Sequence, residues 1–271
     1  MKAQDGRFGR AFLRFASPFA NFRRVPIIGP WLRWASAKLI PRDSLTWVQV
    51  QHGPARGIWL RLNPRTGRDY FNGEVEPEVQ TVLQTYLHAG MTFYDVGANI
   101  GFFSLLAARL VGVGGRVVAF EADPEMAARL REHAVRSVEA PISVEEKAVW
   151  FTAGPVFFAR ADTKLSPDRG VGHVVVGGAT ETSQGTIRVE TVVLDEYAAR
   201  VCQPDFIKCD VEGAEVEVFR GARQLLVEKK PVILCEMHGE ENRRVLLEEF
   251  TRLGYRCEPC GKNHVLATPS G

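Results

Sequence analysis

Short apolar runs alternate with amphipathic stretches along the chain from residue 92 onward. Runs of about four to eight apolar residues predict strands, and apolar residues at helical spacing predict amphipathic helices. The expected strands are 92–96, 116–121, 144–149, 206–210, 231–236 and 264–267, and the expected helices are 101–110, 124–136, 215–226 and 240–253. Continuously apolar strands between amphipathic helices are typical of a parallel sheet covered on both faces. The pattern therefore predicts an α/β fold with a doubly wound, mostly parallel sheet.

Two regions depart from this alternation. Residues 44–65 alternate apolar and polar positions around Gly53-Pro54, which predicts a hairpin, and the next apolar face predicts a helix at 77–88. Residues 151–193 are rich in β-forming side chains and predict an antiparallel excursion from the main sheet. Its β-rich runs are 156–159, 174–176 and 187–193. We expect an N-terminal helical and β extension at 1–67 and a catalytic domain at 68–271.

Composition narrows the class of protein. The 271 residues are 45% hydrophobic and 24% charged, as in ordinary globular proteins, which excludes a disordered or collagen-like chain. Arg7, Arg10 and Arg14 interrupt the start of the chain, so no signal-peptide core is expected there. Five cysteines, an odd number, favour reduced thiols. These features predict a cytoplasmic protein.

Charge is distributed unevenly along the chain. Residues 1–42 hold nine basic side chains and one acidic one, interleaved with phenylalanine and tryptophan, whereas residues 43–271 hold 25 basic and 31 acidic residues. One interpretation is a basic amphipathic surface for peripheral contact with anionic lipid at the inner membrane surface. The other is a pair of helices that pack on the main domain or on a second subunit of a homodimer. The acidic remainder is a poor match to phosphate, so we expect no nucleic-acid partner.

The segment Asp95-Val-Gly97-Ala-Asn99-Ile-Gly101 joins the first strand of the alternating region to its first helix. Glycines there let the backbone turn tightly and approach a ligand. A dinucleotide site needs a pyrophosphate at this turn, and Asp95 would repel it. The carboxylate suits instead the ammonium of a methionine moiety beside a sulfonium. Glu121, which follows the next strand, is placed to accept hydrogen bonds from two ribose hydroxyls. Together they predict S-adenosylmethionine (SAM) as cofactor.

A second polar cluster follows two later strands. Lys208 and Asp210 are two apart in a strand and share a face, and Glu236 and His238 have the same relationship. A hydroxyl group that is to react as a nucleophile requires a base because its pKa is near that of water, about 15.7. Asp210 and His238 are the candidates for that proton, and Lys208 is the candidate to stabilise the alkoxide or to anchor Asp210.

Two other interpretations of this cluster stay open. A buried salt-bridge network that fixes the loop would use the same residue types. A divalent cation such as Mg²⁺ or Mn²⁺ is the other, because oxygen-rich sites suit hard ions. Its ligands would be Asp210, Glu212, Glu236 and His238. We expect no metal requirement on balance.

The motifs at 95–101, 120–124 and 205–215 together resemble the FkbM-type SAM-dependent methyltransferases, and the segments at 73–78 and 193–195 also match that pattern. The resemblance covers roughly residues 68–267. It implies a class I methyltransferase (Rossmann-like) fold, SAM as cofactor, and a hydroxyl acceptor on a sugar, a glycolipid or a secondary metabolite. It also places Asn99 at the cofactor. Glu76, Glu212 and Glu236 are the candidates for contact with the substrate.

The sequence therefore predicts a SAM-dependent O-methyltransferase that works by direct displacement with general-base help. Two rivals remain. A nicotinamide-dependent oxidoreductase would share the sheet and Glu121, but Asp95 and the absence of a GxGxxG motif disfavour it. A non-catalytic scaffold with the same fold could dock at a membrane through residues 1–42.

Overall fold

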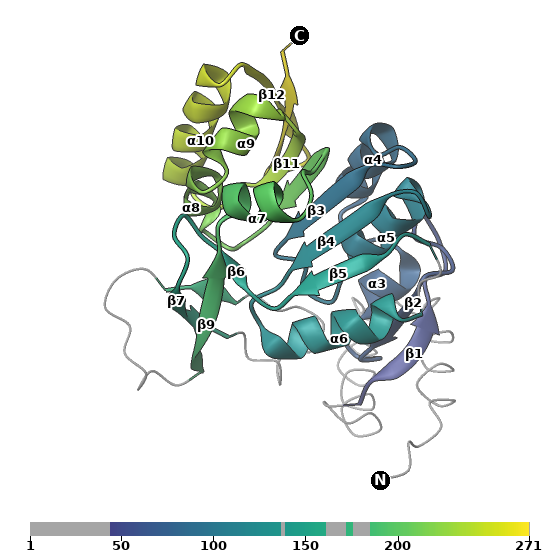
Figure 1. Ribbon diagram of the computed structural model, residues 1–271. Helices are drawn as coiled ribbons and strands as arrows, with labels where there is room; N and C mark the ends of the chain where they lie inside the picture. The colour runs from purple at the N-terminus through teal and green to yellow at the C-terminus, as the bar shows by residue number, and fades with distance from the viewer. Residues whose placement is uncertain (1–43, 137–138, 161–171, 176–184, 271) are drawn as a thin grey trace, which may run out of the picture. The chain divides into compact units, whose positions relative to one another are not determined.

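The computed structural model describes residues 44–136, 139–160, 172–175 and 185–270 (Figure 1). The chain forms two compact units, Met1–Val75 with Asp162–Gly170, and Glu76–Ala161 with Val171–Gly271. In the first unit, β1 (Thr46–Gln49) and β2 (Trp59–Leu62) form the expected antiparallel hairpin, followed by the short helix α3 (Arg68–Asn72). The interpretations of residues 1–42 lie outside the described residues.

The second unit is built on a seven-stranded sheet. Its strands are β3 (Thr92–Val96), β4 (Arg116–Phe120), β5 (Ile142–Glu145), β10 (Phe206–Cys209), β11 (Val232–Glu236), β12 (Tyr255–Cys260) and β13 (His264–Pro269). Their order is β12-β13-β11-β10-β3-β4-β5, and β13 runs antiparallel to both of its neighbours while the pairs from β11 to β5 are parallel. The predicted doubly wound, mostly parallel α/β sheet is confirmed.

Helices cover the two faces of this sheet (Figure 1). The helices of this unit are α4 (Pro77–Tyr86), α5 (Phe102–Val111), α6 (Pro124–Ala134), α7 (Leu194–Arg200), α8 (Glu215–Arg220), α9 (Arg223–Glu228) and α10 (Glu240–Arg252). Tyr94 and Val96 of β3 belong to the core that includes α7, α8, α9 and α10. Because side chains alternate along a strand, Phe93 and Asp95 point to the opposite face, where α5 lies. Asp95 is therefore an acid on a buried face that it shares with its register partner Lys208.

A smaller sheet forms the expected excursion. It consists of β6 (Ala148–Val149), β7 (Pro155–Ala159), β8 (His173–Val174) and β9 (Thr186–Val192), in the order β6-β9-β7-β8. The pairs of β7 with β8 and β9 are antiparallel, as expected, whereas β6 and β9 are parallel. Phe158 and Val189 pack with Ala122 and Ala148 to form its core.

Three local expectations need correction. The strand expected at 144–149 is two strands, β5 and β6, which belong to different sheets and are separated by a turn in which the Lys147 amide donates to the Glu145 carbonyl. The helix expected at 215–226 breaks at Gly221, where a Cβ would lie 2.6 Å from the Trp150 carbonyl oxygen. The edge strand β12 was not expected, because Pro259 and its exposed polar residues hide the strand pattern.

Within the described part of the chain, no helix has both the length and the apolar character of a membrane span.

Candidate active site

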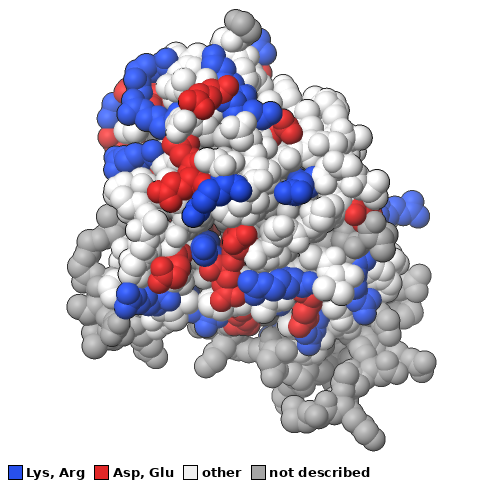
Figure 2. Space-filling model, in the orientation of Figure 1, with Lys and Arg blue, Asp and Glu red and all other residues white. Residues whose placement is uncertain are grey.

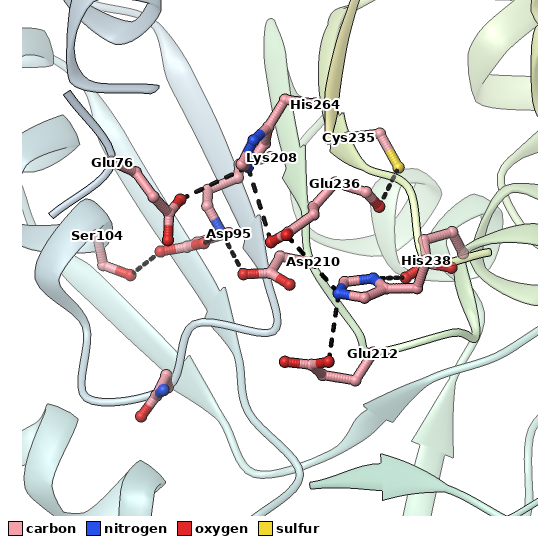
Figure 3. Close-up of polar contacts among 12 residues, drawn as sticks. Glu76, Asp95, Ser104, Lys208, Asp210, Glu212, Cys235, Glu236, His238 and His264 are labelled. Carbon is pink, nitrogen blue, oxygen red and sulfur yellow. Dashed lines mark hydrogen bonds and ion pairs between the residues drawn. The ribbon is translucent and has the colours of Figure 1, made fainter. Parts of the chain in front are cut away.

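The carboxyl ends of β3, β10 and β11 bring polar side chains together in one place (Figure 3). β4 and β5 follow β3 in the chain and extend the sheet on one side of β3. The next strand of this sheet, β10, lies on the other side of β3. In open α/β sheets, ligands bind in the crevice where the strand order reverses in this way. The polar cluster therefore lies where this topology favours a ligand.

A buried lysine lies between two carboxylates at the centre of the cluster. Lys208 and Asp95 are register partners on β10 and β3, and the Lys208 Nζ lies 3.9 Å from Asp95 Oδ1 and 3.3 Å from Asp210 Oδ2. Lys208 and Asp95 are 2% and 1% exposed, whereas the Asp210 side chain is 22% exposed. Ser104 of α5 donates a hydrogen bond of 2.5 Å to Asp95 Oδ2, and Lys208 also lies over the Phe103 ring. Asp210 is thus the member that solvent or a substrate can reach.

Burial and neighbouring charges shift the pKa values of these residues. Burial would lower the pKa of Lys208, but the Asp210, Asp95 and Glu76 carboxylates raise it above its ordinary value. Burial would raise the pKa of Asp210, but Lys208 and His238 hold it below its ordinary value. Burial raises the pKa of Asp95 in spite of Lys208 and Ser104. Asp210 is therefore an ionised carboxylate at neutral pH.

The glycine turn after β3 adjoins this cluster. Gly97 has φ +81°, and a Cβ there would lie 1.8 Å from the Asp210 carbonyl oxygen. Gly101 has φ +84°, and a Cβ there would lie 2.6 Å from Leu130 Cγ. Sequence reasoning assigned these glycines to the approach of a ligand. The structure adds a second reason for them, which is the close packing of the turn against the backbone after β10 and against α6.

Glu121 organises the backbone of the same turn. Its Oε2 accepts a 2.6 Å hydrogen bond from the Asn99 amide, and its Oε1 accepts a 2.7 Å bond from the Asp123 amide. Asp123 caps α6 and is held by Arg160, whose Nε lies 2.8 Å from Asp123 Oδ2. Burial raises the pKa of Glu121 to about 7, although both amide bonds lower it. Since a carboxylate has about four acceptor positions, two remain for a ligand.

His238 is held by acidic neighbours. Its Nδ1 lies 2.7 Å from Glu215 Oε1, and its Nε2 lies 3.2 Å from Glu212 Oε2 and 3.8 Å from Glu236 Oε1. The hydrogen bond to Glu215 raises the pKa of His238 to about 9, although burial lowers it. A histidine with this pKa is protonated at neutral pH and donates from both nitrogens. The geometry therefore favours Asp210 over His238 as the acceptor of a proton.

A second histidine, which sequence reasoning did not assign to the cluster, also lies in it. His264 begins β13, and its Nε2 lies 3.5 Å from Glu76 Oε2 and 3.8 Å from Glu236 Oε2. Burial, followed by the Lys208 charge, lowers the pKa of His264 to about 4. Glu215 and Ser104 were also missed. The pairing of β11 with β13 is the only signal that places His264 here, and a single sequence does not reveal it.

The structure sorts the predicted residues into two adjoining groups. The strand-end cluster contains Glu76, Asp95, Lys208, Asp210, Glu212, Glu236 and His238 (Figure 3). The turn group contains Gly97, Asn99, Gly101 and Glu121. Among the described residues, two sets have ligand atoms within 4.8 Å of one another, close enough to share a metal ion: Glu76, Glu236 and His264, and Asp210, Glu236 and His238. The second of these overlaps the four residues that the sequence offered as an alternative, less favoured metal site.

A model of the methyltransferase FkbM domain matches residues 95–257, more than half of the chain. The chain belongs to the FkbM methyltransferase family. This match spans both groups of the site from Asp95 to His238, and it confirms the resemblance seen in the sequence motifs. Glu76 and His264 lie outside it.

Several known proteins are similar to this FkbM family member. The hexuronic acid methyltransferase AglP of Haloferax volcanii is 28% identical over 167 residues, which are 60% of this chain and 63% of that protein. A methyltransferase FkbM structure from Methylobacillus flagellatus is 18% identical with a TM-score of 0.47, over 66% of this chain and 43% of that one. A SAM-dependent O-methyltransferase structure from Thermotoga maritima is 13% identical with a TM-score of 0.43, over 83% and 78% of the two chains. The chain thus matches less than two thirds of the length of its curated relative.

The sheet order and the family together identify the fold as the class I methyltransferase fold. Its ligand-binding edge is the one at which the polar cluster lies.

Proposed function

We propose that this protein is a SAM-dependent O-methyltransferase that methylates a hydroxyl group of a sugar. Membership of a methyltransferase family supports the reaction class, and the hexuronic acid methyltransferase relative supports a sugar as acceptor. The observation that carries the proposal is the strand-end cluster, in which a reachable ionised carboxylate, Asp210, is anchored by a buried lysine next to the glycine turn.

The described residues fit SAM as the cofactor. Buried side-chain oxygens with no hydrogen-bond partner among the described residues include Asp95 Oδ1 and Asn99 Oδ1, both at the glycine turn. Such atoms are costly to bury unless a ligand completes them. Glu121 would hold the ribose hydroxyls through its free acceptor positions, Asp95 the ammonium of the methionine moiety, and Asn99 would contact the cofactor from the turn. Bound SAM supplies an electrophilic methyl group on a sulfonium.

The cluster would then orient and deprotonate the acceptor. Bound SAM would supply the methyl group to the acceptor oxygen and leave as S-adenosylhomocysteine, and the Asp210 carboxylate would accept the proton of that hydroxyl. Lys208 anchors Asp210, and its positive charge stabilises negative charge that develops on the oxygen. His238, protonated and held by Glu215 and Glu212, would orient the acceptor through the Glu212 carboxylate that it positions. Glu76, Glu212 and Glu236 accept hydrogen bonds from the other hydroxyls of the sugar.

The test combines ligand binding with methyl transfer. Isothermal titration calorimetry on the full chain should show heat for SAM and S-adenosylhomocysteine (SAH) and none for NAD. A labelled methyl group from SAM should appear on at least one member of a panel that contains a hexuronic acid, its glycoside and a neutral hexose. Binding of NAD without SAM would replace the proposal with an oxidoreductase, and binding of neither would favour a non-catalytic scaffold.

Two variants separate the assigned roles. Asp210→Asn should keep SAH affinity within about threefold and lose methyl transfer by about 100-fold or more, the usual contribution of a general base. Glu121→Ala should weaken SAH binding and leave the apparent affinity for the acceptor nearly unchanged. If Asp210→Asn abolishes SAH binding, Asp210 holds the cofactor and its role as base is wrong.

A further inference from the structure

Glu76, Glu236 and His264 form a group of potential ligands at the edge of the strand-end cluster (Figure 3). Glu236 and His264 are direct partners across the antiparallel pair of β11 and β13, so their side chains share one face of the sheet. Glu76 precedes the first turn of α4. Three segments that are distant in the sequence therefore aim one nitrogen and two carboxylates at a common point.

The Nε2 atom of His264 has no hydrogen-bond partner among the described residues although it is deeply buried. The His264 side chain is 4% exposed, and its Nε2 makes no hydrogen bond to any described residue. The Oε2 of Glu76, 3.5 Å away, is also buried without a hydrogen bond within the described part of the chain. Buried polar atoms in folded proteins nearly always have partners. Two such atoms that face each other indicate that a third species completes both.

The backbone at Glu76 points to the same conclusion. Glu76 has φ +39°, a left-handed conformation that is uncommon for a residue with a Cβ. Backbone strain of this kind persists where the surrounding structure enforces it, and strained residues are common at ligand sites.

The distances fit a metal ion better than a water molecule. The Nε2 atom of His264 lies 3.5 Å from Glu76 Oε2 and 3.8 Å from Glu236 Oε2. Ligand atoms about 2.1 Å from a shared ion lie about 3.0–3.4 Å apart in octahedral or tetrahedral geometry. The present spacing would reach this range by shifts of a few tenths of an ångström. A water molecule would bring no positive charge to these two carboxylates, whereas Lys208 forms its ion pairs with Asp210 and Asp95.

We propose that Glu76, Glu236 and His264 bind one divalent transition-metal ion, with Mn²⁺ and Zn²⁺ as the fitting ions. Imidazole nitrogen suits first-row transition metals, and carboxylates suit harder ions, so the mixed set selects these ions over Mg²⁺. Two carboxylates neutralise the ion. Hydroxyl groups of the sugar would occupy the remaining coordination positions of the ion, next to Asp210. Coordination would lower the pKa of these hydroxyl groups. This last role rests on the proposed methyl transfer, whereas the binding of the ion does not.

The second set, Asp210, Glu236 and His238, is the rival site. Its histidine already has Glu215 at 2.7 Å on one nitrogen and Glu212 at 3.2 Å on the other, so it needs no further partner. Asp210 is likewise paired with Lys208. His238 and His264 therefore provide a matched pair of substitutions that distinguishes the two sets.

The test is metal binding by the full chain after removal of metals with a chelator. Titration with MnCl₂, followed by the electron paramagnetic resonance signal of free Mn²⁺, should show one bound ion per chain, and calorimetry with ZnCl₂ should give the same stoichiometry. MgCl₂ should bind more weakly. His264→Phe and Glu76→Gln should each weaken Mn²⁺ binding by about 100-fold or more, since even outer-sphere changes at metal sites cost about 10–100-fold. His238→Phe should stay within about tenfold of the unaltered protein.

The outcomes of these titrations decide between the proposed metal site and its alternatives. Binding of SAH shows that each variant is folded. If His264→Phe does not fold, Glu76→Gln still tests the proposal, because Glu76 lies at the N-terminus of a helix. A lack of stoichiometric Mn²⁺ and Zn²⁺ binding overturns the proposal. Loss of the ion in His238→Phe with retention in His264→Phe overturns it in favour of the rival set. An ion that binds as expected in a protein that methylates no acceptor would overturn the proposed function and leave the metal site in place.

Discussion

Glu121 is deeply buried, although its proposed role in ligand binding requires the charged form of its carboxylate. Two backbone amides already bind it, yet burial raises its pKa to about 7, from an ordinary value of 4.5. Because the charged form is disfavoured in the folded protein, this residue lowers stability as the pH rises from about 4.5 to 7, and the loss is complete above 7. A ligand that donates hydrogen bonds to the carboxylate would favour the charged form and lower its pKa again.

Cofactor binding should therefore be coupled to the loss of a proton. In calorimetry of SAH binding in buffers of different ionisation enthalpy, proton release should approach one per SAH at pH 6 and vanish at pH 8. Affinity should rise about tenfold over that interval, as linkage requires for a pKa that starts near 7 and falls well below 6. Glu121→Gln should abolish the dependence. A proton release that survives in Glu121→Gln would belong to another group.

At the scale of elements, the turn between β3 and α5 is fixed by what packs against it. The Asp210 carbonyl approaches Gly97 so closely that a Cβ would lie 1.8 Å from it, and this carbonyl belongs to the segment between β10 and α8. The glycine thus joins the cofactor turn to the loop that carries Asp210. Any side chain at Gly97 would separate two parts of the site.

Substitution of two glycines measures this contact. Gly90 has φ +89° and open space around its Cβ position, so Gly90→Ala should cost about 1 kcal/mol for the left-handed backbone alone. Gly97→Ala meets the same backbone cost and a backbone oxygen that has little room to move, and it should cost about 1–3 kcal/mol more. Urea unfolding of both variants gives the comparison. Equal losses of unfolding free energy in the two variants would show that the Gly97 turn and the Asp210 loop move apart freely.

At the scale of the whole second unit, one lysine holds the acidic cluster together. Lys208 is buried between carboxylates from β3 and from the end of β10. Its pKa lies above the ordinary value of 10.5, so its stabilising contribution is complete at neutral pH and is lost only at high pH. The face shown in Figure 2 carries Lys and Arg side chains interspersed with Asp and Glu side chains. In the strand-end cluster acids outnumber bases, and Lys208 and Asp95 at its centre are almost fully shielded from solvent.

Removal of the Lys208 charge should be costly for folding. Lys208→Met leaves Asp95 and Asp210 uncompensated and should lower the free energy of unfolding at pH 7 by about 3 kcal/mol or more. The loss should shrink toward pH 4, because the carboxyl groups then take up protons. Lys229 forms a partly exposed pair with Asp205 at 2.6 Å, and Lys229→Met should cost about 1 kcal/mol or less. Similar losses in the two variants would contradict the role given to Lys208.

The order of elements and the turn group followed from the sequence, because these features are local. Strand and helix periodicity are properties of short windows, and Asp95, Gly97, Asn99, Gly101 and Glu121 sit at strand ends that the pattern marks directly. The parallel sheet then places those strand ends on one edge. Lys208, Asp210, Glu236 and His238 could be expected there for the same reason.

Other features depended on contacts between distant segments, which only the tertiary structure decides. Gly221 breaks a helix because the Trp150 backbone lies beside it, and β5 and β6 separate because each finds a different partner strand. His264 joins the site because β13 pairs with β11 in the register that sets it opposite Glu236. A one-residue slip would turn that side chain to the other face of the sheet. Periodicity determines which segments become strands, but the packing of the whole sheet determines their register and therefore which side chains meet.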